Sequence, residues 1–214
     1  MAEAPGGGGP GAKGAVEVVD PGAVEAANAR RVAESKATIP HLYLEAVAGL
    51  PPQSGAGPEH MIRACAIALG DFPRLNGSYR DGRFELHSRI NLGTALFAQD
   101  SVLFPTIFDA AEKDATAIAA ELAAHAERAR SGVLTQPELS GATFSLADLS
   151  ESGISRGWLA VNRGQAAILT VGAPAPGSRA LCLSADHRIV RANDGASFLG
   201  RVAELLAGVP GSLA

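Results

Sequence analysis

Apolar positions that recur every three or four residues predict four helices along the chain. The first follows an Asp-Pro pair at residues 20–21, which suits an N-cap and a first helical position. Pro58 opens the second helix, Asp114 can cap the third, and Asp194 can cap the last. The predicted helices cover residues 22–35, 58–70, 115–132 and 194–208.

Stretches in which apolar and polar residues alternate predict β-strands between these helices. In residues 179–187, for example, Leu181, Leu183 and Ala185 alternate with Cys182, Ser184 and Asp186. Helices and strands interleave along the chain, which predicts an α/β fold with a mixed sheet covered by helices. The predicted strand segments cover residues 38–47, 83–97, 101–108, 141–149, 165–173 and 179–187.

The chain of 214 residues is long enough for one domain with a sizeable core. No internal repeat and no second domain are visible in the sequence. Residues 1–15 are rich in Gly and Pro, so we expect a flexible leader there and a single domain over residues 16–214.

Composition and charge exclude several classes of protein. The net charge of −4 at pH 7 gives no electrostatic case for nucleic-acid binding. No apolar run reaches the roughly 20 residues that a membrane span requires. Cys65 and Cys182 lie in apolar surroundings, so we expect buried free thiols in a reducing compartment. No group of Cys, His and Asp has the spacing of a metal site, and we expect none.

The stretch SADHRIVRANDG, residues 184–195, carries the strongest candidate for chemistry. His187 stands at the end of a predicted strand, shortly before the last predicted helix. An imidazole is the usual general base at neutral pH, and it suits the removal of a proton from a thiol with a pKa of about 8.5.

Several segments, in order and at similar separations, resemble the catalytic domain of the 2-oxoacid dehydrogenase dihydrolipoyl acyltransferases, a family that shares its fold with the chloramphenicol acetyltransferases. The resemblance runs from about Val16 to Leu206. It implies a chloramphenicol acetyltransferase-like fold and a homotrimer whose active site lies in a channel between subunits. The segments that carry it are TIPH, NLGTAL, GATFSLADL, NRGQAAILTVGA and LSADHRIV followed by DGASFL.

The resemblance also implies a reaction, namely acyl transfer between a dihydrolipoyl arm and a pantetheine thiol on coenzyme A or an acyl carrier protein. His187 would be the general base, and a hydroxyl group of the neighbouring subunit would hold the oxyanion. His41, in the TIPH segment, would line the channel wall on the lipoyl side.

The same resemblance sets the expected partners. No cofactor would be bound covalently. Because residues 1–15 hold neither a lipoyl nor a subunit-binding domain, two expectations stay open: the lipoyl group lies on a separate carrier protein, or this chain is an excised domain. An acyl carrier protein and a dehydrogenase component are further expected partners.

Two positions depart from the family pattern in ways that affect catalysis. Ala147 stands where the family has a Ser or Thr as oxyanion donor, and Arg191 stands where the motif D-H-R-x-x-D-G has its aspartate. Loss of one oxyanion donor typically lowers kcat by about 10²–10³. Ser145 shares a strand face with Ala147, but its displacement of about 6–7 Å makes it a poor substitute.

The aspartate that Arg191 replaces pairs, in the family, with an arginine of the N-terminal helix, here Arg30 or Arg31. Because Arg191 would make that pair repulsive, we expect its side chain to turn outward or to recruit an acid such as Asp194 or Asp148.

Arg188 has two possible roles. Together with Arg191 it could contact the phosphates of a pantetheine-bearing acceptor. The alternative is an ion pair within the chain, for example with Asp186, and we favour that pair.

The favoured function is therefore acyl transfer of the dihydrolipoyl type. Two alternatives stay open. One is a catalytically impaired trimer that serves as a scaffold or as a partner of an active paralogue. The other is an O-acetyltransferase of the chloramphenicol type. We expect the bacterial cytoplasm, rather than the mitochondrial matrix, as the compartment.

Overall fold

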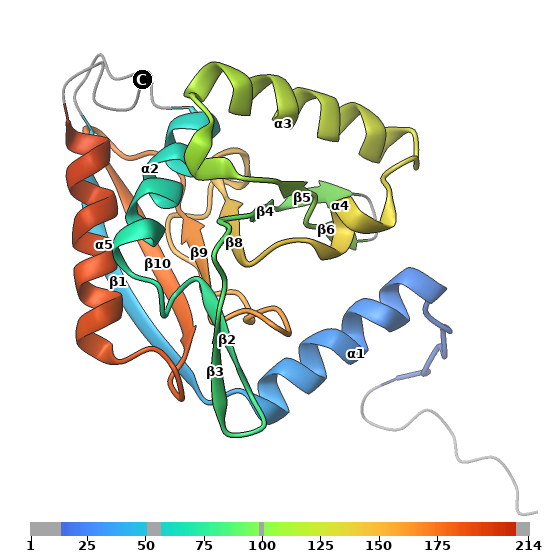
Figure 1. Ribbon diagram of the computed structural model, residues 1–214. Helices are drawn as coiled ribbons and strands as arrows, with labels where there is room; N and C mark the ends of the chain where they lie inside the picture. Colours follow the sequence, from blue (N-terminus) through green and yellow to red (C-terminus); the bar gives the residue numbers. More distant parts are fainter. Residues whose placement is uncertain (1–13, 51–56, 99–100, 209–214) are drawn as a thin grey trace, which may run out of the picture.

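A six-stranded mixed sheet forms the centre of the protein in the computed structural model, which describes residues 14–50, 57–98 and 101–208 (Figure 1). The strand order is β1-β10-β9-β8-β4-β7. β10 runs antiparallel to both of its neighbours, whereas β8 runs parallel to β9 and to β4. The predicted α/β fold with a mixed sheet is confirmed. The strands are β1 (His41–Gly49), β4 (Leu92–Thr94), β7 (Thr106–Ile107), β8 (Phe144–Asp148), β9 (Ala167–Val171) and β10 (Ser178–Asp186).

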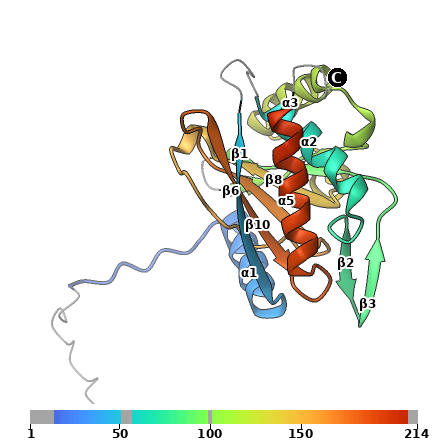
Figure 2. The same cartoon turned by 90° about the vertical axis from the view of Figure 1, so that its left-hand side faces the viewer.

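The described residues form five α-helices around this sheet, and α5 and α1 lie on opposite sides of it (Figures 1 and 2). α5 packs against β1 and α2, and its Phe198 and Val202 join Leu181 and Leu183 of β10 in the main hydrophobic core. This burial of apolar area is the main driving force for folding. The helices are α1 (Ala23–Thr38), α2 (Pro58–Asp71), α3 (Ala115–Arg130), α4 (Gln136–Ser140) and α5 (Ala192–Ala207).

Two small hairpins and two 3₁₀ turns complete the described chain. The β2–β3 hairpin projects from the sheet beside α2 (Figures 1 and 2). Within the described residues, no helix has the length and apolarity needed to cross a membrane. The remaining elements are β2 (Gly77–Arg80), β3 (Arg83–Leu86), β5 (Leu96–Ala98), β6 (Ser101–Leu103), η1 (Ala110–Glu112) and η2 (Ser150–Ser152).

Helix starts were predicted with mixed success. Pro58 occupies the first turn of α2, and Asp114 caps α3 by accepting a 2.7 Å bond from the Ala117 N–H. The predicted start at residues 20–21 is wrong, because Gly22 is the N-cap of α1 and its N–H donates to the Glu25 carboxylate at 3.0 Å. The predicted cap Asp194 is also wrong, since it lies within the first turn of α5.

The long strand predicted over residues 83–97 is divided into β3, β4 and β5. The Asn76 side-chain amide explains the division. Its nitrogen donates to the carbonyls of His87 and Arg89, at 3.0 and 2.9 Å, and these bonds hold the chain in a bend between β3 and β4.

Most of the leader predicted over residues 1–15 lies outside the described residues, so the leader and the domain boundary at residue 16 stay predictions. The segment that follows is described and leads away from the sheet (Figure 1). Its Val16, Val18 and Val19 are 74–86% exposed, which makes an apolar strip that none of the described residues covers.

The segment between η2 and β9 is anchored where its backbone meets the end of β9. The Ala173 N–H donates to the Ile154 carbonyl at 2.8 Å, and a Cβ on Gly172 would lie 1.9 Å from the Ser155 carbonyl oxygen. Only a residue without a side chain fits this backbone contact.

We predict that Gly172→Ala destabilises the protein by about 1–3 kcal/mol, because segment 154–155 must move away from β9. The matched control is Gly200→Ala on α5, where a Cβ meets no heavy atom within 4 Å. The control should be neutral or stabilising by up to about 1 kcal/mol, since Ala favours a helix over Gly. Urea unfolding curves measure both, and equal stabilities would contradict the tight contact at Gly172.

Candidate active site

His187 lies directly after the last residue of β10, in the turn that follows this interior strand of the sheet. The carbonyl of Asp186 accepts bonds from the N–H groups of Ile189 and Val190, at 3.1 and 2.9 Å. The His187 N–H donates to the Pro40 carbonyl at 2.9 Å, which ties this turn to the chain just before β1. The backbone of His187 is therefore held from two sides.

The ring of His187 is solvent-exposed in the single chain, and one of its nitrogens is fixed. Nδ1 lies 3.1 Å from the Val190 carbonyl oxygen. A carbonyl oxygen can only accept, so Nδ1 carries the hydrogen and the lone pair is on Nε2. This tautomer leaves the Nε2 lone pair, which accepts no hydrogen bond from the described residues, able to take a proton from a substrate.

Asp186 and Arg188 form a two-pronged ion pair beside this histidine. Arg188 Nε lies 2.9 Å from Asp186 Oδ1, Arg188 Nη2 lies 2.7 Å from Oδ2, and the backbone N–H of Arg188 also donates to Oδ1 at 3.0 Å. The Asp186 side chain is 2% exposed, and the Arg188 guanidinium also stacks on the Tyr79 ring at 4.4 Å. The pair favoured for Arg188 from the sequence is confirmed.

Arg191 turns to a local partner, as expected. Its Nε and Nη2 donate to the carboxylate of Asp194 at 3.0 and 3.2 Å, and this ion pair lowers the pKa of Asp194. Asp194 therefore neutralises Arg191 near the start of α5. Asp148, the other acid considered, is the last residue of β8 and does not pair with Arg191. Its carboxylate lies 3.5 Å from the Arg179 guanidinium.

The part of the site on β8 lacks a free hydroxyl group at the position where the resemblance expects one. Ala147 is fully buried. Ser145 is also buried, and its hydroxyl donates to Gln165 Oε1 at 2.8 Å and accepts from Asn162 Nδ2 at 2.9 Å. Thr170, opposite Ala147 on β9, has a buried hydroxyl without a hydrogen-bond partner in the described part of the chain.

His187 and Ala147 are far apart within one chain. Ala147 pairs with Thr170, and Thr170 pairs with Cys182, so His187 lies five residues further along β10 and two strands away. These offsets correspond to about 16 Å along the strands and about 10 Å across them. One chain therefore does not bring its own His187 to its own Ala147.

His41 is held by hydrogen bonds at both ring nitrogens. Nδ1 lies 2.8 Å from the Ile39 carbonyl, and Nε2 accepts from the Val161 N–H at 3.1 Å. Burial lowers the pKa of His41, which agrees with a neutral ring that bridges two backbone segments. His41 therefore shapes the wall near residue 161 and has no lone pair to spare.

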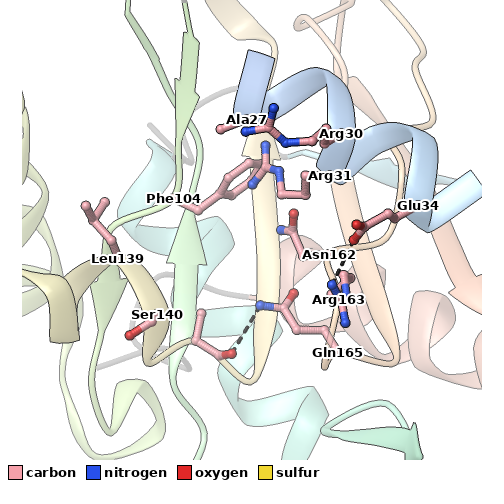
Figure 3. A pocket seen from close by; sticks show the side chains of 11 residues that line it. Ala27, Arg30, Arg31, Glu34, Phe104, Leu139, Ser140, Asn162, Arg163 and Gln165 are labelled. Carbon is pink, nitrogen blue, oxygen red and sulfur yellow. Dashed lines mark hydrogen bonds and ion pairs between the residues drawn. The ribbon is translucent and has the colours of Figure 1, made fainter. Parts of the chain in front are cut away.

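A cavity of about 450 Å³ lies between α1 and the loop before β9 (Figure 3). Its wall combines Arg30 and Arg31 of α1 with Phe104, Asn162 and Gln165. The sequence points to both arginines through the family resemblance but predicts no role for the other three residues. The pattern NRGQ in the resemblance was the available signal for Asn162 and Gln165.

Within the described residues, no group of three His, Cys, Asp or Glu side chains is arranged to hold a metal ion. Cys65 and Cys182 are buried free thiols, as predicted, and burial raises the pKa of both. Their low tendency to ionise makes them poor nucleophiles.

Comparison with known proteins gives one consistent result. The family model for the 2-oxoacid dehydrogenases acyltransferase catalytic domain matches residues 59–213. The lipoamide acyltransferase component of the branched-chain alpha-keto acid dehydrogenase complex of Bacillus subtilis is 32% identical over 158 residues, which cover 68% of this chain and 37% of that protein. The chain thus spans well under half the length of this curated relative.

Solved structures agree with this match. A probable dihydrolipoamide acetyltransferase from Listeria monocytogenes has a TM-score of 0.84 at 26% identity, covering 93% of this chain and 99% of that one. The cubic core of a pyruvate dehydrogenase multienzyme complex has a TM-score of 0.86 at 25% identity, covering 94% and 96%. A chloramphenicol acetyltransferase shares the fold at 14% identity, with a TM-score of 0.50 and coverage of 83% and 94%.

We predict that Arg188→Met destabilises the protein by about 2–4 kcal/mol, because it leaves the buried Asp186 carboxylate without its counter-ion. Arg191→Met is the matched control, since it breaks an exposed pair and should not measurably change the free energy of unfolding. Thermal and urea unfolding measure the difference. Equal losses in the two variants would show that the Asp186 pair adds no more than a surface ion pair.

Proposed function

The chain belongs to the family of 2-oxoacid dehydrogenase acyltransferase catalytic domains, and on that premise we propose that it transfers an acyl group between a dihydrolipoyl thiol and a pantetheine thiol. The observation that carries the proposal is the geometry of His187. Its Nδ1–H is held by the Val190 carbonyl, and its Nε2 is free beside an anchored turn.

The reaction needs a base and no redox partner. Nε2 of His187 takes the proton of the attacking thiol, and the thiolate sulfur forms a bond to the thioester carbonyl carbon. The tetrahedral intermediate then collapses, the bond to the departing sulfur breaks, and that sulfur takes the proton back from the imidazolium. One thioester replaces another, so charge and oxidation state are unchanged.

The proposed site is shared between copies of the chain. The distance between His187 and Ala147 within one chain supports this arrangement, because a reaction centre between them requires His187 from one copy and β8 from another. We propose a homotrimer on this ground. The exposed apolar strip of Val16, Val18 and Val19 offers a surface for such contacts.

The proposed substrates are borne on carriers. Coenzyme A or a phosphopantetheine-bearing acyl carrier protein would supply one thiol, and a lipoyl group on another protein domain would supply the other. A dehydrogenase component that loads the lipoyl arm is a further proposed partner. Relatives named above belong to branched-chain alpha-keto acid and pyruvate dehydrogenase complexes, which supports this class of partner.

The two alternative functions gain no support from the comparisons. The chloramphenicol-type reading depends on a shared fold at 14% identity. The impaired-scaffold reading depends on Ala147 and Arg191, and Arg191 is neutralised by Asp194 without disturbing the His187 turn. A cytoplasmic compartment also stays a prediction, because the curated relatives include both bacterial and mitochondrial proteins.

His187→Ala should slow catalysed thioester exchange between acyl-dihydrolipoamide and coenzyme A by about 10²–10⁴-fold, because the general base is removed. The assay follows acyl-coenzyme A formation by chromatography, with His60→Ala on α2 as the control for loss of a histidine. Equal rates for the parent, His187→Ala and a protein-free blank would reject the enzymatic function and leave the scaffold reading.

Ala147→Ser should raise kcat, by up to about 10²-fold, because it returns a hydroxyl donor to the strand where the oxyanion is expected. Ser145→Ala is the comparison variant, since Ser145 is already engaged by Asn162 and Gln165. A rate that does not change in Ala147→Ser, in a protein that folds as the parent does, would place the oxyanion elsewhere.

A further inference from the structure

Thr170 of β9 is the unusual side chain on the sheet face that carries Ala147. Both residues are fully buried, and the Thr170 hydroxyl has no hydrogen-bond partner among the residues that the structure describes. A buried hydroxyl without a partner costs free energy, and most such groups in folded proteins are paired. The partner of this hydroxyl therefore lies outside the described part of the chain.

The strand register places Thr170 directly beside Ala147. β8 and β9 are parallel neighbours in which these two residues are paired, so their side chains share a face of the sheet about 4.8 Å apart. Ser145, on the same face of β8, lies about 6–7 Å from Ala147 along the strand and is already bound by Gln165 and Asn162. Of the two hydroxyls, Thr170 is thus the nearer one and the one that is still available.

Packing explains the methyl group of Thr170 but not its hydroxyl. A Cβ on Gly157, in the segment between η2 and β9, would lie 3.9 Å from Thr170 Cγ2, so the methyl branch faces this segment. The hydroxyl leaves the same carbon in a different staggered direction. A valine would fill the space equally well without burying a polar atom, so the hydroxyl has another purpose.

We propose that Thr170 is a catalytic residue that donates a hydrogen bond to the oxyanion, in place of the hydroxyl that Ala147 lacks. This inference rests on the proposed acyl transfer. An oxygen bound over the gap between β8 and β9 lies about 2.4 Å to the side of each strand, within reach of a hydrogen bond of about 2.7–3.1 Å from Thr170. Thr170 keeps its proton throughout, while His187 of another copy carries the proton that is transferred.

The surroundings of Thr170 suit an oxyanion donor. Its full burial excludes water, so a hydrogen bond to a charged oxygen is stronger there than in solution. No bond to a described residue has to break before the hydroxyl can donate. Ser145, by contrast, would first have to break its 2.8 Å bond to Gln165.

Thr170→Val should lower kcat for thioester exchange by about 10²–10³-fold, the usual effect of losing one oxyanion donor. Thr170→Ser should keep most of the parent kcat, because it keeps the hydroxyl. Ser184→Ala is the matched control, since it removes another buried hydroxyl without a described partner, on β10 and paired with Ile168. An unchanged kcat in Thr170→Val, with a parent that is faster than a protein-free blank, would overturn this inference and leave the proposed reaction standing.

The stability of the same variant separates a catalytic role from a structural one. Removal of a buried hydroxyl that has no partner should stabilise the fold, so the urea midpoint of Thr170→Val should rise while its kcat falls. A lower midpoint would show that the hydroxyl is bonded within the folded protein, and would overturn the assignment to the oxyanion.

An infrared measurement tests the hydrogen bond without turnover. The probe is acetyl-coenzyme A with a carbon-13 label at the thioester carbonyl, bound to His187→Ala. A hydrogen bond from Thr170 should shift the carbonyl band to lower frequency than in solution, and His187→Ala/Thr170→Val should lose that shift. Such a loss supports the inference even if the parent catalyses no exchange, whereas the same band in both variants would overturn it.

Discussion

The buried carboxylate of Asp186 is the constraint on which the site depends. It lies at the end of β10, a strand whose two faces are both buried, so the carboxylate cannot be satisfied by water. The guanidinium and backbone N–H of Arg188 satisfy it instead, and the Asp186 carbonyl closes the turn through Ile189 and Val190. His187 lies between these contacts, so its position follows from the need to neutralise its neighbour.

Much of this local arrangement could be predicted from the sequence. The alternation of Leu181, Leu183 and Ala185 identifies β10, and a His in an Asp-His-Arg triplet at its end is a candidate by position and chemistry. The partners of Asp186 and Arg191 lie only two or three residues away, where short-range reasoning is sufficient. Asp114 and Pro58 marked helix starts correctly because capping is a local effect.

Features that depend on distant contacts could not be predicted in the same way. Asn76 divides a predicted strand by binding carbonyls 11 and 13 residues ahead. The cavity combines Arg31, Phe104 and Asn162, which come from three separate parts of the chain. No periodicity relates them, so only the fold brings them together. Ala147 was identified by comparison with a family pattern. The Thr170 hydroxyl opposite it, which has no hydrogen-bond partner among the residues that the structure describes, became apparent only from the strand register.

The proposed sharing of the site between copies of the chain has a genetic consequence. In a shared site, each copy contributes its base to one reaction centre and its β8 edge to another. Consider two inactive alleles, one with a substitution at His187 and one with a substitution near β8. Each then damages a different half of the shared reaction centre. Mixed oligomers contain some centres in which both halves are intact, so two defective alleles restore activity to each other when they are expressed together.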